Sequence, residues 1–280
     1  MSDIYVIKAS GDRVIFDQEK LHRSLDKAGA GLDIITEVIV GLEDHLYDGI
    51  TTRKIYRQAY KLLDKLSKRN AGRYRLKEAI FELGPSGYPF EYFVGELLKN
   101  QGYSTQVGVI VKGKCVTHEI DVIAENEHNH FMVECKFHSR PGKKSNVIVP
   151  MYIHSRFRDI IATMENLPGY NTKLHQSWVV TNTRFTTDAI DYGKCSGMKM
   201  ISWDYPHDAS LSHRISRSGL HPVTSLSSLK KAEKQKLLSL GIVTGRNLLD
   251  DKNQLEEMGV SYKRIDKIIK EVNDIINNQD

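Results

Sequence analysis

Asp121, Glu134 and Lys136 stand among apolar residues in the stretch "HEIDVIAENEHNHFMVECKF", which covers residues 118 to 137. The stretch has the pattern of two β-strands joined by a turn at "ENEHN". In the second strand Glu134 and Lys136 share one face, because alternate residues of a strand point the same way. Pairing of the two strands brings Asp121 of the first strand near Glu134. Such a half-buried face is costly unless its charges compensate each other or hold a cation.

The chemistry that fits this trio is phosphodiester hydrolysis. Two neighbouring carboxylates repel each other, and a hard divalent cation with oxygen ligands, such as Mg²⁺, relieves that repulsion. A lysine beside the ion stabilises the charge that develops on a phosphate and assists the attacking water. The alternative is an exposed hairpin with a surface salt bridge between Glu134 and Lys136, which gives the pattern no chemical role.

The elements that would position the trio alternate between strands and helices. A helix is expected at "PFEYFVGELLKNQGY", where Pro89 occupies the first helical position. Strands are expected around 106–112, 115–124 and 130–137, a helix around 150–165, and a buried strand at "QSWVVTN". A helix at "TTDAIDYGKCSG" and a strand at "MKMISWDY" follow. This order predicts a mixed β-sheet covered by helices.

With these residues in place, the stretch resembles the PD-(D/E)xK nuclease superfamily, in particular its Mrr-like restriction endonucleases. "HEIDVIA" is similar to the family's metal-aspartate strand, "VECKF" to its E-x-K strand, and "PFEYFVGELLKNQGY" to its opening helix. The resemblance implies that Asp121 and Glu134 bind Mg²⁺ or Mn²⁺ and that Lys136 is the catalytic lysine. It also implies that Glu91, on the opening helix, adds a further carboxylate.

The first part of the chain has the pattern of a short hairpin, "IYVIKASGDRVIF", followed by helices. Together with "LYDGITTRKIYRQAYKLLDKL", it resembles the ATP-cone, a nucleotide-sensing module found on ribonucleotide reductases and their repressor. The resemblance implies that ATP or dATP is a regulatory ligand, and Lys8 and Lys20 would contact its phosphates. The implied binding residues are Val6, Lys8, Phe16, Asp17, Lys20, Leu21 and Thr52. The alternative is a plain interaction domain.

The last part of the chain is helical, with glycines in "KLLSLGIVTGRNLL" and "LEEMGVSYKRIDKII". These segments resemble helix-hairpin-helix repeats, whose hairpins present backbone N–H groups to a DNA phosphate. The implied DNA contacts are Gly241, Arg246, Gly259, Lys263 and Arg264. Because the charges of this part nearly balance, a protein-interaction role stays open.

Basic residues gather in two regions, although the net charge of the 280 residues is only +5. Basic clusters neutralise phosphates, and the alternative is a solvated helix face. Lys143 and Lys144 of the second cluster follow the carboxylate hairpin, so we expect them to contact DNA. The first cluster comprises Arg53, Lys54, Arg57, Lys61, Lys65, Lys68, Arg69, Arg73, Arg75 and Lys77. The second comprises Arg140, Lys143, Lys144, Arg156 and Arg158.

Composition narrows the class of protein. The longest apolar runs are shorter than the ~18–20 residues of a membrane span, and the N-terminus lacks the pattern of a secretory signal. The three cysteines fit neither a disulfide framework nor a CxxC metal site. No GxxxxGK[ST] motif of an ATPase is present. We therefore expect a cytoplasmic protein with no membrane partner.

The chain is thus predicted to be a multi-domain α/β protein. We expect an ATP-cone over 1–87, a nuclease domain over 88–206, a linker over 207–225, and a small all-α domain over 226–280. The expected function is a Mg²⁺-dependent DNA endonuclease gated by ATP or dATP. A restriction or defence role follows only from the resemblance, and we expect a homo-oligomer. The alternatives are a nucleotide-responsive DNA-binding regulator with a silent nuclease fold, and a repair or junction-resolving nuclease.

Overall fold

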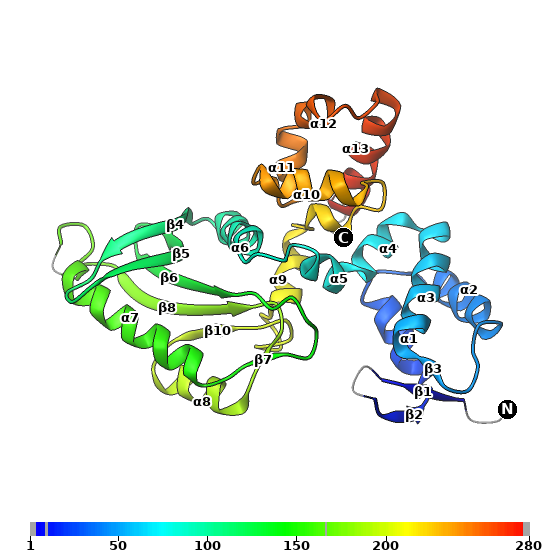
Figure 1. Ribbon diagram of the computed structural model, residues 1–280, viewed down its shortest axis with the longest axis horizontal. Helices are drawn as coiled ribbons and strands as arrows, with labels where there is room; N and C mark the ends of the chain where they lie inside the picture. The colour runs from blue at the N-terminus through cyan, green and yellow to red at the C-terminus, as the bar shows by residue number, and fades with distance from the viewer. Residues whose placement is uncertain (1–3, 9–10, 166, 277–280) are drawn as a thin grey trace.

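Figure 1 shows three lobes in the computed structural model, which describes residues 4–8, 11–165 and 167–276. The largest lobe is built on a five-stranded sheet, and a smaller N-terminal lobe combines a three-stranded sheet with helices. The C-terminal lobe is helical and lies at the junction of the other two. The predicted combination of a mixed sheet with flanking helical parts is therefore present.

The N-terminal lobe pairs three short strands with helices. Strand β1 (Tyr5–Ile7) is antiparallel to β2 (Arg13–Ile15) and parallel to β3 (Ile50–Thr51). Its helices are amphipathic and enclose a core that includes Leu25, Val38 and Leu63. These helices are α1 (Gln18–Asp26), α2 (Leu32–Glu43), α3 (Thr52–Leu66) and α4 (Lys68–Tyr74). A short helix, α5 (Leu76–Phe81), leads from this lobe to the next.

The large lobe contains a sheet with the strand order β10-β8-β6-β5-β4. Strands β4, β5 and β6 form an antiparallel meander, whereas β6, β8 and β10 run parallel to one another. Their bounds are β4 (Ser104–Lys112), β5 (Thr117–Glu125), β6 (Asn129–Lys136), β8 (Leu174–Thr181) and β10 (Lys199–Ile201). Two further short strands, β7 (Lys144–Ser145) and β9 (Arg184–Phe185), pair with each other. The predicted mixed sheet is thus confirmed.

Helices cover both faces of this sheet, and strand alternation decides which residues each helix meets. Helix α6 (Tyr88–Asn100) packs its Phe90 and Phe93 in the same core as Val133 and Cys135 of β6. On the other face, α7 (Ile148–Met164) packs with Met132 of β6. Helix α8 (Thr187–Cys195) lies beside α7 and β10. The face of β6 that contains Glu134 and Lys136 is therefore the α7 face.

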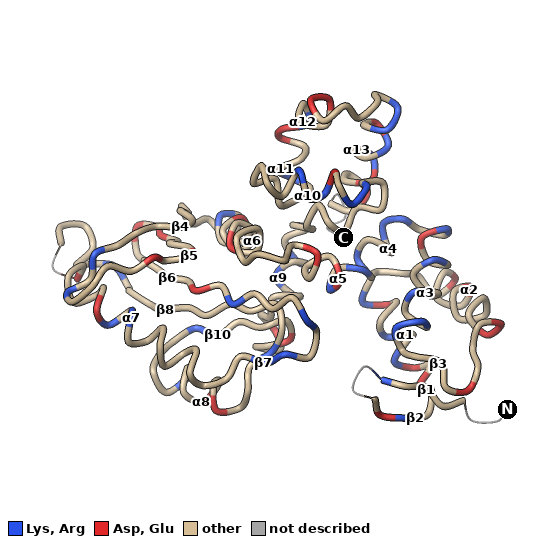
Figure 2. Tube along the Cα trace, in the orientation of Figure 1, with Lys and Arg blue, Asp and Glu red and all other residues tan. Residues whose placement is uncertain are grey.

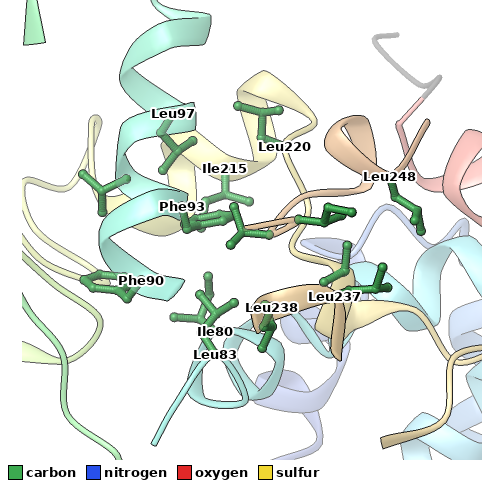
Figure 3. Close-up of a cluster of buried hydrophobic side chains, with 14 of the residues drawn as sticks. Ile80, Leu83, Phe90, Phe93, Leu97, Ile215, Leu220, Leu237, Leu238 and Leu248 are labelled. Carbon is green, nitrogen blue, oxygen red and sulfur yellow. The ribbon is translucent and has the colours of Figure 1, made fainter. Parts of the chain in front are cut away.

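The segment 207–225, predicted to be a linker, is instead a packed part of the core. It forms helix α9 (Leu211–Ser218) and a 3₁₀ turn at Val223–Ser225. Leu211 and Ile215, four residues apart on one face of α9, are 1% and 0% exposed. Figure 3 shows Ile215 beside Phe93 of α6, and Leu220 belongs to the same core cluster. The serines and histidines that indicated a linker occupy the remaining positions of this amphipathic segment.

The C-terminal lobe comprises α10 (Lys231–Ser239), α11 (Gly245–Asp250), α12 (Asn253–Glu257) and α13 (Tyr262–Ile276). Leu237, Leu238 and Leu248 belong to the same hydrophobic core as α6 and α9 (Figure 3). Thr224 Oγ1 donates a hydrogen bond of 2.6 Å to the carbonyl oxygen of Ala79 in α5. Helix α13 lies against α4 of the N-terminal lobe, so the C-terminal lobe is packed against both others. No described helix has the length and apolarity needed to cross a membrane.

Candidate active site

The predicted carboxylate pair lies where strands β5 and β6 separate. Their backbone pairing ends at Val122 and Val133, although β6 continues its pairing with β8 as far as Lys136. The next residues along the two strands are Asp121 and Glu134. In place of a backbone partner, the N–H of Cys135 donates a hydrogen bond of 2.7 Å to Asp121 Oδ2. The fold therefore brings Asp121 and Glu134 side by side and fixes the Asp121 carboxyl group.

The electrostatics of Asp121 reflect this crowding. Burial, and after it the negative charge of Glu134, raises the pKa of Asp121 to about 7. The hydrogen bond from Cys135 opposes the shift, because it favours the ionised carboxylate. A carboxyl group that titrates near neutral pH beside a second carboxylate is a feature of functional sites.

Glu91 belongs to the same acidic neighbourhood. It lies in the first turn of α6, and Gly87 at the start of that helix lies against its carboxylate. Burial raises the pKa of Glu91, followed by the charges of Glu119 and Glu134. The opening helix thus brings the predicted additional carboxylate towards the strand pair.

Lys136 lies at the end of β6, two residues beyond Glu134, and its side chain is exposed. The loop that follows β6 is basic. Lys143 and Lys144 are both exposed, and Lys144 begins the short strand β7. Burial lowers the pKa of His138, and the charges of Lys143 and then Lys136 lower it further. The predicted DNA-contacting loop therefore lies next to the predicted catalytic lysine.

Arg156 is a member of this site that was not predicted to be one from the sequence. It belongs to α7, and its Nη1 donates a hydrogen bond of 2.8 Å to Glu134 Oε2. Its Nη2 also donates to the carbonyl oxygen of Glu119. The side chains of Arg156 and Glu134 are only 17% and 16% exposed. In the sequence, the only indication that Arg156 belongs to this site was its membership of the basic cluster after the hairpin.

The donors present fit a hard divalent cation. Asp121 and Glu134 supply carboxylate oxygens, which Mg²⁺ and Mn²⁺ prefer, and the charge of Glu134 is one of the causes that raise the pKa of Asp121. Arg156 already places one positive charge on Glu134. Across the described ranges, no group of three or more His, Cys, Asp or Glu side chains has metal-site geometry. A two-carboxylate site matches an ion that keeps several of its waters, as Mg²⁺ does.

Comparison with known proteins agrees with this geometry. The restriction endonuclease family model, for the Mrr catalytic domain, matches residues 84–206, and a model described as "AF1548-like, C-terminal" matches residues 221–276. An uncharacterized protein of Archaeoglobus fulgidus is 34% identical over 187 residues, which cover 65% of this chain and 99% of that protein. The chain belongs to the AF1548-like family.

A solved structure supports the same assignment. The crystal structure of "protein of unknown function AF1548" is 32% identical, covers 69% of this chain and 99% of its own, and has a TM-score of 0.56. The restriction endonuclease domain indicates nuclease activity and DNA as the substrate. Both matched models begin at or after residue 84, so the N-terminal lobe lies outside them.

The residues predicted to bind a nucleotide lie in the N-terminal lobe. The β1–β3 register pairs Ile7 with Thr51, and Lys8 and Thr52 are the residues that follow this last pair. Lys20 is exposed, and its Nζ lies 3.2 Å from Asp17 Oδ2. The remaining predicted residues belong to one hydrophobic cluster: Val6, Phe16 and Leu21.

The first predicted DNA hairpin of the C-terminal lobe faces another helix. Gly241 has a φ of 77°, and a Cβ placed there would lie 3.7 Å from the ring of Tyr92 in α6. Beside it, Asn247 Nδ2 donates a hydrogen bond of 2.9 Å to Glu96 of α6. Arg246, between them in sequence, is half-buried. This hairpin connects the C-terminal lobe to the helix that also contains Glu91.

The second predicted hairpin is open. Gly259 has a φ of 74°, and a Cβ placed there would have no described neighbour within 4 Å. Lys263 in the first turn of α13 is exposed. Arg264 is engaged within the lobe, because its Nη1 lies 2.6 Å from Glu233 Oε1. Of the predicted DNA contacts in this lobe, Gly259 and Lys263 are thus the accessible ones.

Proposed function

We propose that this chain is a Mg²⁺-dependent DNA endonuclease whose activity is regulated by ATP or dATP bound to its N-terminal lobe. The observation that carries the proposal is the side-by-side placement of Asp121 and Glu134 at the point where β5 and β6 separate. That placement lies inside the restriction endonuclease domain, and Lys136 follows on the same strand. A role in restriction of foreign DNA is the biological setting that fits this domain.

The residues divide the chemistry of phosphodiester hydrolysis between them. Asp121 and Glu134 would hold the cation, which when bound supplies Lewis-acid activation of the phosphate. Lys136, two residues beyond Glu134 on the same strand, would stabilise the negative charge that develops on the phosphate oxygens. Lys143 and Lys144 supply positive charge for the DNA backbone near the end of β6.

Nucleotide regulation is supported by the arrangement of the lobes. Lys8 and Thr52, which follow the last residue pair of β1 and β3, belong to the predicted nucleotide site. The C-terminal lobe contacts the N-terminal lobe, because Gly72 of α4 lies against Ile275 of α13. The same lobe contacts α6 through Asn247 and Glu96. A nucleotide that binds one arrangement of these lobes better than another would shift the population, including an oligomeric equilibrium.

One observation favours a second candidate function, a nucleotide-responsive DNA-binding regulator whose nuclease fold is silent. Arg156 forms an ion pair with the Glu134 carboxylate, so the chain itself neutralises one of the two negative charges of the site. A regulator of this kind would bind DNA, respond to nucleotide and leave the DNA intact.

Plasmid cleavage separates the two functions. Supercoiled plasmid is incubated with the full chain and Mg²⁺, with and without ATP or dATP, and in EDTA. The proposal expects nicking or linearisation that needs Mg²⁺ and changes with nucleotide. Intact plasmid in every arm, with DNA binding retained, would instead support the silent regulator.

A further inference from the structure

One face of helix α3 concentrates positive charge that the candidate active site does not use. The helix contains five basic residues and one acidic residue, whereas the net charge of the whole chain is +5. Four of these basic residues are exposed on the side opposite the buried Ile55, Ala59 and Leu63. At 3.6 residues per turn they fall within an arc of about 80°. This α3 basic face consists of Lys54, Arg57, Lys61 and Lys65.

The charges of this face are largely uncompensated. Among the described residues, Arg57, Lys61 and Lys65 form no ion pair, and the single acidic residue of the helix, Asp64, pairs with Lys68 at 3.1 Å. Lys54 Nζ donates a hydrogen bond of 2.9 Å to the hydroxyl of Tyr47. Figure 2 shows Lys and Arg positions along α3 and the neighbouring α4.

The N-terminal half of the face is hollowed. Lys54, Arg57 and Lys61 line a concavity of about 460 Å³, together with Tyr47 and the buried Ile50. The one acidic side chain in its described lining is Asp44. A concave surface lined by one sign of charge focuses the field and attracts anions.

We propose that the α3 basic face binds the phosphate backbone of duplex DNA outside the cleavage site. This inference rests on the proposed function in one respect, since it takes DNA as the substrate of the chain. From Lys54 to Lys65 the face is about 16 Å long, and duplex DNA presents roughly ten phosphate charges over that length. An extended row of cations matches a continuous polyanion better than the clustered phosphates of one nucleotide.

The predicted nucleotide site lies on another side of the helix. Thr52 precedes Lys54 by two residues, which places it about 180° around the helix axis from the centre of the basic face. Lys8 and Thr52 both follow the last residue pair of the β1–β3 register, Ile7 and Thr51. The chain can therefore hold a nucleotide and a DNA backbone on the N-terminal lobe at the same time. The contact would read the backbone and not the base sequence.

The test compares DNA binding by the full chain and two matched variants in EDTA, where cleavage is suppressed. The first variant is Arg57→Gln/Lys61→Gln/Lys65→Gln. The control, Lys194→Gln/Lys252→Gln/Lys270→Gln, removes the same charge from exposed positions elsewhere. Fluorescence anisotropy is recorded over a series of salt concentrations with labelled duplexes of roughly 40 and roughly 12 base pairs. Thermal unfolding checks that both variants fold.

We expect the α3 variant to lose roughly tenfold or more in affinity for the long duplex, and its log–log salt dependence to become shallower by about 0.9 for each lost phosphate contact. The short duplex, which fills the cleavage site alone, should bind nearly as before, and the control should keep the wild-type slope. Equal slopes for both variants would overturn the inference, as would a loss of ATP affinity with unchanged DNA affinity. A wild-type chain that neither binds nor cleaves DNA would instead overturn the proposed function itself.

Discussion

Arg156 donates a hydrogen bond of 2.8 Å to Glu134, and each of these side chains is less than one-fifth exposed. The guanidinium group of α7 therefore lies on one of the two carboxylates that would hold a cation. Asp121, the second carboxylate, forms no such ion pair among the described residues. Burial is the main cause that raises its pKa to about 7. The site has one carboxylate neutralised by the chain and one that still favours a cation or a proton.

Removal of the guanidinium should strengthen cation binding. In Arg156→Gln the Glu134 carboxylate no longer has to leave a charge-assisted hydrogen bond, worth about 1.5–3 kcal/mol, so Mn²⁺ affinity should rise roughly tenfold. Isothermal titration of Mn²⁺ into the DNA-free chain measures this. Arg158→Gln, an exposed arginine on the same helix, is the control. Affinity no higher in Arg156→Gln than in Arg158→Gln would show that the arginine does not compete with the ion.

The contribution of Asp121 to the stability of the cation-free chain should fall as the pH rises from about 4 to about 7. The pKa of Asp121 is about 7 in the folded chain and starts from an ordinary value of 3.8, so the folded chain binds more protons in this window. The contribution is present below the ordinary pKa and is lost as pH rises through the folded value. Asp121→Asn should remove an effect on the order of 4 kcal/mol, because one pKa unit corresponds to about 1.4 kcal/mol. Thermal unfolding in EDTA that gives parallel pH profiles for both proteins would refute this.

The segment 207–225 should behave as core in a mutational test. Leu211 is 1% exposed, so Leu211→Ala should lower the free energy of unfolding by about 2–5 kcal/mol. His207→Ala, at an exposed position four residues earlier, should change it by less than about 0.5 kcal/mol. Denaturant unfolding compares the two variants. Equal stability would mean that the segment is a linker after all.

Nucleotide binding should depend on the hairpin lysine. In Lys8→Gln, loss of one charge-assisted contact to a phosphate should lower ATP affinity roughly tenfold. Isothermal titration measures the affinity, and Lys27→Gln, an exposed lysine just beyond α1, is the control. If the two variants bind ATP equally well, the predicted site is misplaced.

The closeness of Asp121 and Glu134 was predictable because strand pairing through a short turn is a local property. The run from His118 to Phe137 specifies two strands and a turn, and the pairing of Val122 with Val133 completes the placement. Arg156 was not predictable as a partner of Glu134, because a helix distant in sequence packs on that face and no local spacing records the contact.

The linker prediction for residues 207–225 was wrong because it relied on amino-acid composition and not on the spacing of the apolar residues. The abundance of serine and histidine in 207–225 indicated a linker, yet Leu211 and Ile215 have the four-residue spacing that buries one side of α9. At Gly241 the sequence indicated a tight turn, which the positive φ confirms. It contained no sign that Tyr92 of α6 would lie against that turn, because such a contact is set by the packing of two lobes.

The most direct test of the catalytic assignment is the rate at which Lys136→Ala nicks supercoiled plasmid with saturating Mg²⁺. The ammonium group acts on charge that develops in the reaction, so its removal should slow nicking roughly 100- to 1,000-fold, with DNA affinity and unfolding temperature little changed. A Lys136→Ala chain that nicks plasmid at the wild-type rate would contradict the assignment of Asp121, Glu134 and Lys136 as the catalytic site.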